Sequence, residues 1–285
     1  MGGGSAEREI SLKTGKAIYA ALKRRGYQAS TIDVDVSLPW VLKRKKIDVA
    51  FLALHGPGGE DGTVQGMLDV LGIPYTGSGV RASAVGMNKS MTKALVEREG
   101  VPVVSGMCLQ KGEKTGPPKK LKWPLVVKPV DQGSTVGVSI VYTSAQWKTA
   151  LRRAWRQGSA VLAESYIDGR EIAVSVLDGK ALPTVEIVAP GGFYDFAAKY
   201  LKSETRYLCP APLTQRQDRQ MKEWAVRSYQ VLGCEGAARV DFRINAKGRP
   251  FFLEINTIPG MTERSLLPMA AAQARISYEA LTERI

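Results

Sequence analysis

Four polar side chains that could serve metal or transfer chemistry lie between residues 236 and 261. Arg239 and Asp241 are two residues apart, as are Glu254 and Asn256. Side chains two apart on a strand point to the same face of a sheet. Carboxylate and amide oxygens are hard ligands of the kind that Mg²⁺ and Mn²⁺ prefer. The pattern predicts such a site at Asp241, Glu254 and Asn256, with a merely solvated polar face as the alternative.

Two strands must position these side chains, and we predict them over residues 236–244 and 249–256. The intervening residues 245–248, with the sequence NAKG, favour a turn. The sequence therefore predicts a hairpin with one polar face.

The spacing D-x12-E-x-N, followed by T-x-P-G-M-T, resembles the carboxy-terminal signature of the ATP-grasp carboxylate–amine ligases, and in detail that of the D-alanine–D-alanine ligases. This resemblance implies that the three oxygen ligands hold two Mg²⁺ or Mn²⁺ ions against the phosphates of ATP. It also implies that Arg239 and the Gly260 N–H stabilise a tetrahedral oxyanion. Ser265 and the Leu266 backbone would hold the carboxylate of a second D-alanine.

The length of 285 residues is enough for two or three modest domains. No apolar run approaches the ~20 residues of a membrane span, so we expect no membrane partner. The three cysteines, Cys108, Cys209 and Cys234, lack CxxC spacing, which indicates neither a disulfide framework nor a zinc ribbon. Without a signal peptide at the start, we expect a soluble protein of the reducing cytoplasm.

The formal net charge of +13 raises the possibility of nucleic-acid binding. The basic runs at residues 43–46, 111–122 and 148–156 are scattered, and none carries the interleaved aromatic residues of a base-stacking platform. We therefore expect no nucleic-acid partner, and attribute the charge to an anionic substrate such as ATP and to solvated surface.

The chain opens with MGGGSAEREISLKTG, a glycine-rich turn before an amphipathic helix that runs through residue 25, with Ser5 as the predicted N-cap. In the resembled ligases an apolar strand precedes this motif. We therefore expect the first strand to be missing here and an edge of the first sheet to be exposed. The resemblance implies that Glu7 pairs with the ammonium group of the first D-alanine.

His55 is the only histidine, and it follows a predicted buried parallel strand over residues 48–54. Ligands bind at the carboxyl ends of strands in α/β folds, although a lone histidine is as often structural. The pattern HGxxGEDGxxQG resembles the same ligases and implies that His55 and Glu60 line the first amino-acid site. Nearby we predict a strand over 27–34 and helices over 40–45 and 63–71.

A helix is predicted over residues 81–99, after a loose GxGxx[GA] match at 77–82 that is weak as a dinucleotide fingerprint. Lys89 on this helix could be an ordinary surface lysine. Its placement after Ser83 and Met87 resembles the family pattern and implies a contact with phosphate.

After a basic connector, a strand over residues 123–129 carries Lys128, and residues 131–138 form the glycine loop DQGSTVGV. This loop is not a Walker A sequence, but Ser134 and its neighbours offer N–H and hydroxyl groups to an anion, whereas a flexible turn is the alternative. The strand-Lys-Pro followed by GSxxGV resembles the family's phosphate-covering loop. It implies that Lys128 and Ser134 contact ATP and that Ser134 belongs to the catalytic hydrogen-bonded set.

The adenine site follows from the same resemblance. Glu164 and the backbone of Tyr166 and Ile167 would read the edge of the base, while Glu171 would bind the ribose hydroxyls. The surrounding elements are predicted as a helix over 146–157, a strand over 160–166, a hairpin of 171–177 with 182–187, a helix over 216–232 and a final helix after 267.

Residues 191–209 show no clean period, which is typical of a lid or a disordered loop. They include FYD-x-x-x-KY, which resembles the closing loop of the family. The resemblance implies that Lys199 reaches the phosphates and Tyr200 the first substrate. This Lys-Tyr pair further implies a dipeptide rather than an ester product.

These motifs follow the family's order along nearly the whole chain. We predict an α/β (α+β), three-domain ATP-grasp fold with an N-terminal Rossmann-like (pre-ATP-grasp) domain at 1–82 that lacks its first strand. A central ATP-grasp subdomain at 83–165 and a C-terminal subdomain at 166–285 with the metal and substrate site would follow. The resemblance implies a homodimer that ligates two D-alanine molecules through an acyl phosphate for peptidoglycan synthesis. The alternative is an ATP-grasp ligase for another amino-acid pair; a serine hydrolase is disfavoured because no GxSxG elbow is present.

Overall fold

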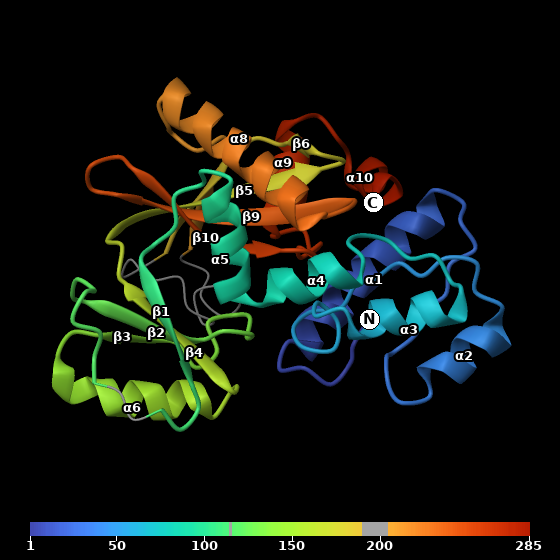
Figure 1. Cartoon of the computed structure of the whole chain (residues 1–285). Helices are drawn as coiled ribbons and strands as arrows, with labels where there is room; N and C mark the ends of the chain where they lie inside the picture. Colours follow the sequence, from blue (N-terminus) through green and yellow to red (C-terminus); the bar gives the residue numbers. More distant parts are fainter. Residues whose placement is uncertain (114–115, 190–204) are drawn as a thin grey trace.

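The computed structural model describes residues 1–113, 116–189 and 205–285. Its strands form two antiparallel sheets, with α6 along the four-stranded sheet and α8 along the six-stranded sheet (Figure 1). The strand orders are β1-β4-β2-β3 and β10-β9-β5-β7-β8, and β6 also pairs with β5. The strands are β1 (Gly106–Gln110), β2 (Leu125–Pro129), β3 (Ser139–Val141), β4 (Ala160–Ser165), β5 (Gly169–Leu177), β6 (Lys180–Ala181), β7 (Val185–Val188), β8 (Arg206–Leu208), β9 (Ala237–Asn245) and β10 (Pro250–Asn256).

The helices and sheets together confirm the predicted mixture of α and β structure. None of the described helices is both long and apolar enough to cross a membrane. The helices are α1 (Arg8–Arg24), α2 (Leu38–Lys45), α3 (Thr63–Leu71), α4 (Val80–Met87), α5 (Lys89–Arg98), α6 (Ser144–Trp155), α8 (Gln215–Leu232), α9 (Leu266–Gln273) and α10 (Tyr278–Arg284).

The N-terminal part differs from the prediction, because residues 27–34 and 48–54 are extended without forming strands. A strand needs a ladder of backbone hydrogen bonds to a neighbour. Residues 48–54 contribute a parallel bridge between Ala50 and Tyr75. Residues 27–34 form two backbone hydrogen bonds with Met1, of 3.1 and 3.0 Å. These contacts are too few for a sheet.

The helix predicted over residues 81–99 is two helices, α4 and α5, separated by Asn88. Asn88 has extended backbone angles, and its side chain accepts a hydrogen bond from the Met91 N–H at 3.0 Å, so it is the N-cap of α5. The Lys89 N–H donates to the Val130 carbonyl at 3.0 Å. This break fixes the start of α5, and therefore Lys89, against the end of β2.

Further differences concern short elements. The sequence analysis did not identify β1 or β3, which have five and three residues and leave most of their side chains partly exposed. The final helix after residue 267 is likewise two helices, α9 and α10. The second predicted hairpin is present, since Glu171 of β5 pairs with Ile187 of β7, with β6 between them in sequence.

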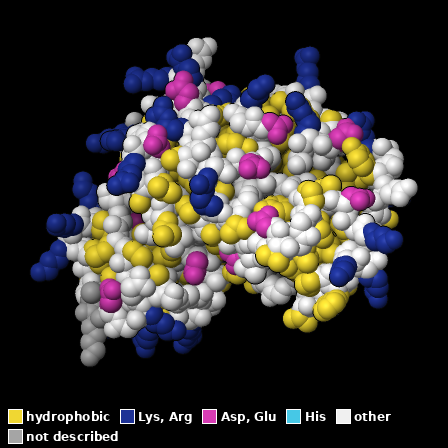
Figure 2. All heavy atoms as spheres, turned by 45° about the vertical axis from the view of Figure 1, so that its right-hand side comes forward, with side chains coloured by type: hydrophobic (Ala, Val, Ile, Leu, Met, Phe, Trp, Pro, Cys, Tyr) yellow, Lys and Arg dark blue, Asp and Glu magenta, His cyan; other side chains and the backbone are white. Residues whose placement is uncertain are grey.

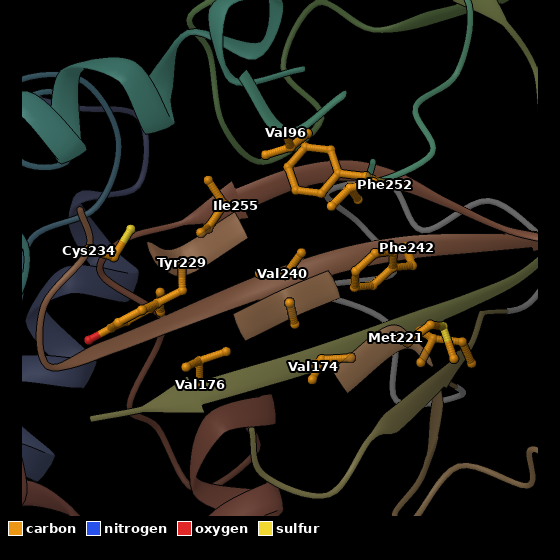
Figure 3. Close-up of a cluster of buried hydrophobic side chains, with 14 of the residues drawn as sticks. Val96, Val174, Val176, Met221, Tyr229, Cys234, Val240, Phe242, Phe252 and Ile255 are labelled. Carbon is orange, nitrogen blue, oxygen red and sulfur yellow. The ribbon is translucent and has the colours of Figure 1, made fainter. Parts of the chain in front are cut away.

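The apolar face of the six-stranded sheet packs against α5 and α8. Figure 3 shows the buried side chains of this core. Phe242 of β9 and Phe252 of β10 are fully buried, with their rings edge to face at 6.1 Å between centroids. Val96 of α5 and Met221 of α8 cover them. Because side chains alternate along a strand, this core leaves the opposite face of β9 and β10 available for polar residues.

The first and last helices lie against each other. Arg24 of α1 pairs with Glu279 of α10 at 2.8 Å, and Arg25 pairs with Glu283. These ion pairs join the C-terminal end of α1 to α10. The first turns of α1 and the start of α9 both contribute to the lining of the cleft described next.

Candidate active site

The predicted hairpin is present as β9 and β10, and a β-bulge aligns its polar side chains. Glu254 pairs with Asp241, with Leu253 as the extra residue on β10. In a regular ladder Glu254 would lie opposite Val240 and point to the apolar face. The bulge therefore places the polar residues of both strands on one face, which alternation along the sequence did not reveal.

The predicted metal ligands are oxygen donors beside cations. Arg239 donates to both carboxylate oxygens of Asp241, at 2.8 Å each, and Asp241 is 5% exposed. Lys89 Nζ lies 3.4 Å from Glu254, and the side-chain carbonyl of Asn256 accepts a backbone N–H at 2.9 Å. Arg239 and Lys89 thus balance the charges of Asp241 and Glu254, and a divalent ion bound between these carboxylates would balance the same charges. This oxygen-only set fits Mg²⁺ or Mn²⁺.

The polar face opens into a cleft of about 610 Å³. Its walls come from the start of α1, the loops after residues 54 and 131, the end of β10 and the start of α9. Asp241 is buried and is not among the lining residues, and the predicted Lys199 and Tyr200 lie outside the described residues. The predicted site residues that line the cleft are Glu7, His55, Glu60, Lys89, Ser134, Arg239, Glu254, Asn256, Gly260, Ser265 and Leu266.

A second cavity, of about 110 Å³, lies between the two sheets. It shares Lys89, Gly133, Ser134 and Glu254 with the larger cleft, so the two are continuous at these residues. A ligand in the smaller cavity can therefore present one end to the larger cleft. The predicted nucleotide residues that line it are Lys89, Lys128, Ser134, Glu164, Tyr166, Ile167 and Glu171.

The glycine loop at residues 131–138 has an unusual backbone. Ser134 and Thr135 have φ values of 49° and 64°, in the left-handed region that L-residues rarely occupy. Such strain typically occurs at ligand-binding loops and costs about 1–3 kcal/mol per residue. Both residues line the smaller cavity, and Ser134 also faces the larger one. The loop thus forms the boundary between the two.

Glu7 joins this loop to the N-terminal helix. The Ser134 hydroxyl donates to Glu7, which is 8% exposed. A Cβ at Gly133 would lie 2.9 Å from the Glu7 carboxylate, so glycine permits this close approach. The predicted N-cap Ser5 is wrong, because Glu7 is the N-cap of α1. The Ser5 hydroxyl donates to the His55 carbonyl at 2.6 Å and accepts from the Glu7 N–H at 3.2 Å, just before the helix.

His55 and Glu60 form a buried polar pair at one wall of the cleft. His55 Nδ1 lies 3.7 Å from Glu60 Oε1, and Nε2 lies 3.3 Å from the Thr14 hydroxyl. Glu60 Oε2 accepts from the Gly56 N–H at 2.8 Å. Glu60 Oε1 has no hydrogen-bond partner within the described part of the chain. A buried acceptor of this kind suits a polar ligand group.

The start of α9 also lines the cleft. Ser265 precedes the helix, and its hydroxyl accepts from the Thr262 N–H at 3.0 Å. Leu266 is the first helical residue, and both line the cleft. The partial positive charge of a helix N-terminus favours an anion such as a carboxylate.

Glu164 is held by two lysines, one of which the sequence analysis missed. It is 2% exposed and pairs with Lys128 of β2 and Lys93 of α5. Burial alone would raise the pKa of Glu164, but the two ammonium groups hold it below its ordinary value. Burial lowers the pKa of Lys93 to about 8, against the opposing effect of Glu164. The sequence does contain one indication of Lys93: it follows Lys89 by four residues, which places both lysines on one face of the helix.

Arg243 was also missed. Its guanidinium lies 5.4 Å from the centroid of the Tyr166 ring and 3.5 Å from Glu171, and it donates to the Gly169 carbonyl at 3.0 Å. Arg243 follows Asp241 by two residues on β9, so strand alternation could have placed it on the polar face. It connects the residues predicted to bind adenine and ribose.

The basic charge is distributed over the surface. In Figure 2 the Lys and Arg side chains are spread around the visible face, with Asp and Glu between them. The run at residues 43–46 includes the last turn of α2, where cations offset the helix dipole. On this face the charge gives no continuous track of the kind a nucleic-acid backbone requires.

Comparisons with known proteins agree with these features. The family described as "D-ala D-ala ligase C-terminus" matches residues 95–285, and "D-ala D-ala ligase N-terminus" matches residues 42–78. The D-alanine–D-alanine ligase of Syntrophotalea carbinolica is 48% identical, over 100% of this chain and 93% of its own length.

Two solved structures that resemble this chain are ligases of the same kind. The D-alanine–D-alanine ligase from Bacillus anthracis, complexed with ATP, has a TM-score of 0.88 at 36% identity, covering 100% of this chain and 94% of that one. The VanG D-Ala:D-Ser ligase from Enterococcus faecalis has a TM-score of 0.86 at 26% identity, covering 100% and 96%. This agreement in sequence and structure along the whole length confirms the ATP-grasp fold, and the chain belongs to the D-alanine–D-alanine ligase family.

Proposed function

We infer that this chain catalyses the ATP-dependent ligation of two D-alanine molecules to D-alanyl-D-alanine for peptidoglycan synthesis. The observation that carries this inference is the junction of the two cavities at Lys89, Ser134 and Glu254. ATP in the smaller cavity would present its γ-phosphate to an amino acid in the larger cleft. Bringing the two reactants together in this way is the main requirement of phosphoryl transfer.

In the first step a carboxylate oxygen of the first D-alanine attacks the γ-phosphorus. A new O–P bond forms, the bond from the γ-phosphorus to the β–γ bridging oxygen breaks, and ADP departs, so the product is the acyl phosphate of D-alanine. We propose that Lys89 and Lys128, with Lys199, neutralise the phosphate charge. Two Mg²⁺ or Mn²⁺ ions, when bound at Asp241, Glu254 and Asn256, would supply Lewis-acid stabilisation of that charge.

The remainder of the nucleotide occupies the smaller cavity in this proposal. Glu164 and the backbone of Tyr166 and Ile167 take the adenine, and Glu171 takes the ribose hydroxyls. The buried position of Glu164 and the contact of Glu171 with Arg243 support these roles, because both side chains have defined orientations.

The first D-alanine lies between two walls of the cleft. Glu7 pairs with its ammonium group, while His55 and Glu60 line the site. Ser134 and Tyr200 complete a hydrogen-bonded set around it. Burial of Glu7 supports this assignment, since a carboxylate at the edge of a closed site favours a matching cation.

In the second step the free amine of the second D-alanine attacks the acyl carbonyl carbon. A C–N bond forms, the C–O bond to phosphate breaks, and inorganic phosphate leaves. Arg239 and the Gly260 N–H would stabilise the tetrahedral oxyanion. Ser265 and the Leu266 N–H would hold the carboxylate of the second substrate at the start of α9.

Further proposals concern the setting of the reaction. We propose a cytoplasmic homodimer, because ATP is a cytoplasmic substrate and exposed Val36, just before α2, and Trp40, on α2, offer apolar contact surface. We also propose the three-part division at residues 1–82, 83–165 and 166–285. Light scattering of the purified chain at several concentrations tests the dimer.

Phosphate release from ATP and Mg²⁺, with D-alanine, L-alanine or no amino acid, tests the function. We expect release with D-alanine alone, together with D-alanyl-D-alanine detected by mass spectrometry. Mixtures of D-alanine with D-serine or D-lactate then define the second substrate. Release that is independent of D-alanine, or a product other than D-alanyl-D-alanine in the D-alanine arm, would contradict the assignment.

A further inference from the structure

One buried carboxylate faces two buried lysines beside the smaller cavity. Glu164, Lys93 and Lys128 are 2%, 6% and 8% exposed, and Glu164 forms an ion pair with each lysine through a different oxygen. They come from three elements, β4, α5 and β2. Burying ions is costly unless they are paired. One lysine would neutralise Glu164, so the presence of a second buried lysine calls for a separate explanation.

The two lysines differ in what they can reach. Lys128 and Glu164 line the smaller cavity, whereas Lys93 lines neither cavity. Lys93 therefore contacts Glu164 without being exposed to either cavity. Lys89, one turn earlier on α5, instead donates to the Gln132 carbonyl at 2.6 Å and lies 3.4 Å from Glu254. Of the lysines on this face of α5, Lys93 is the one directed at Glu164.

We propose that Lys93 is a positioning residue: it is the counter-ion that stays on Glu164 when Lys128 turns to the phosphates of ATP. This inference rests on the proposed assignment of the smaller cavity to ATP. Without ATP, both lysines neutralise the carboxylate. With ATP, the phosphates recruit Lys128, and Lys93 alone keeps the buried carboxylate paired and in place for the base.

The charge balance explains why Lys93 would matter for a ligand that it does not touch. If Lys93 were uncharged, Lys128 would be the single cation paired with Glu164. Moving Lys128 to the phosphates would then leave a buried carboxylate unpaired, which is strongly unfavourable. Loss of Lys93 should therefore weaken the recognition of phosphate more than the recognition of adenosine.

Lys93→Met tests this, because it removes the charge and keeps an unbranched chain. We expect the dissociation constant of MgADP, measured by calorimetry, to rise about 10-fold, while that of adenosine changes less than about 3-fold. Lys93→Arg should restore most of the MgADP affinity. Lys148→Met, the same change at an exposed position on α6, is the matched control and should affect neither ligand.

A second variant separates this role from a structural one. In Lys93→Met/Glu164→Gln the neutral amide no longer competes for Lys128, so we expect the ratio of MgADP to adenosine affinity to return to within about 3-fold of the unmodified protein. Equal weakening of both ligands, or no selective loss of MgADP affinity, would overturn the inference and leave the proposed function intact. Failure of the unmodified protein to bind either ligand would overturn both.

Discussion

The guanidinium of Arg239 holds both carboxylate oxygens of Asp241, at 2.8 Å each, from two residues away on the same face of β9. Arg239 also lines the large cleft, where the proposed oxyanion would form. In the proposed mechanism this one side chain would therefore have two roles: it orients a proposed metal ligand and offers a hydrogen-bond donor to the substrates.

Replacing Arg239 with alanine should lower kcat for dipeptide formation by about 10²–10³, the usual loss when an oxyanion donor is removed. Arg239→Lys should recover little, because an ammonium group cannot reproduce the two-pronged contact with Asp241. Steady-state phosphate release at saturating substrates measures both variants, and thermal unfolding checks the fold. A folded Arg239→Ala enzyme with normal kcat would contradict the oxyanion role.

Glu254→Gln should raise the Mg²⁺ concentration needed for half-maximal activity by at least about 10-fold, because it removes one anionic ligand. The measurement is a titration of activity with Mg²⁺ after treatment with a chelator. Glu97→Gln makes the same change at an exposed site on α5 and should leave the titration unchanged. Identical titrations for the two variants would exclude Glu254 from the metal site.

Glu7→Gln should raise the KM of the first D-alanine about 10- to 100-fold, since hydrogen bonds to charged groups contribute about 1.5–3 kcal/mol. The KM of ATP should change little, because Glu7 lines the large cleft and not the smaller cavity. Exposed Glu9 on the same helix provides the control, Glu9→Gln. A change confined to the KM of ATP would place Glu7 elsewhere in the reaction.

The three thiols should react at different rates. Burial raises the pKa of Cys234 to about 11, and burial also raises the pKa of Cys209, whereas Cys108 is exposed. The thiolate is the reactive form, so at pH 8 Cys234 stays protonated and unreactive. We expect iodoacetamide to label Cys108 first in the folded protein and all three in denaturant, as read by mass spectrometry. Fast labelling of Cys234 would show that its site opens.

Local patterns were sufficient for much of the fold. The predicted helix at residues 63–71 and the hairpin strands agree with the structure within a residue or two, because their patterns of polarity and turn residues are strong. The break at Asn88 was missed since a residue that can cap a helix can also continue one. The extended segments near residue 50 were predicted as strands, because a sequence shows polarity and not the neighbour that completes a ladder.

The sequence predicted most of the residues that line the site, but it did not predict how they are arranged in space. The sequence motifs named residues from both cavities, but not their junction, which depends on how α1, the loop at 131–138 and β10 meet. Lys93 and Arg243 carry no motif of their own. Their importance comes from what they contact, Glu164 in one case and Glu171 in the other, and such contacts exist only in the folded chain.

The bulge at Leu253 means that a change in the length of β10 would affect the smaller cavity more than the pairing of Glu254 with Asp241. Leu253 and Glu254 are consecutive, yet both line the smaller cavity. Deleting Leu253 would leave Glu254 opposite Asp241 in an ordinary ladder, so the proposed metal ligands would keep their register while the smaller cavity lost one of its lining side chains. A change in chain length at this point would therefore reshape the smaller cavity and leave the pairing of Glu254 with Asp241 intact.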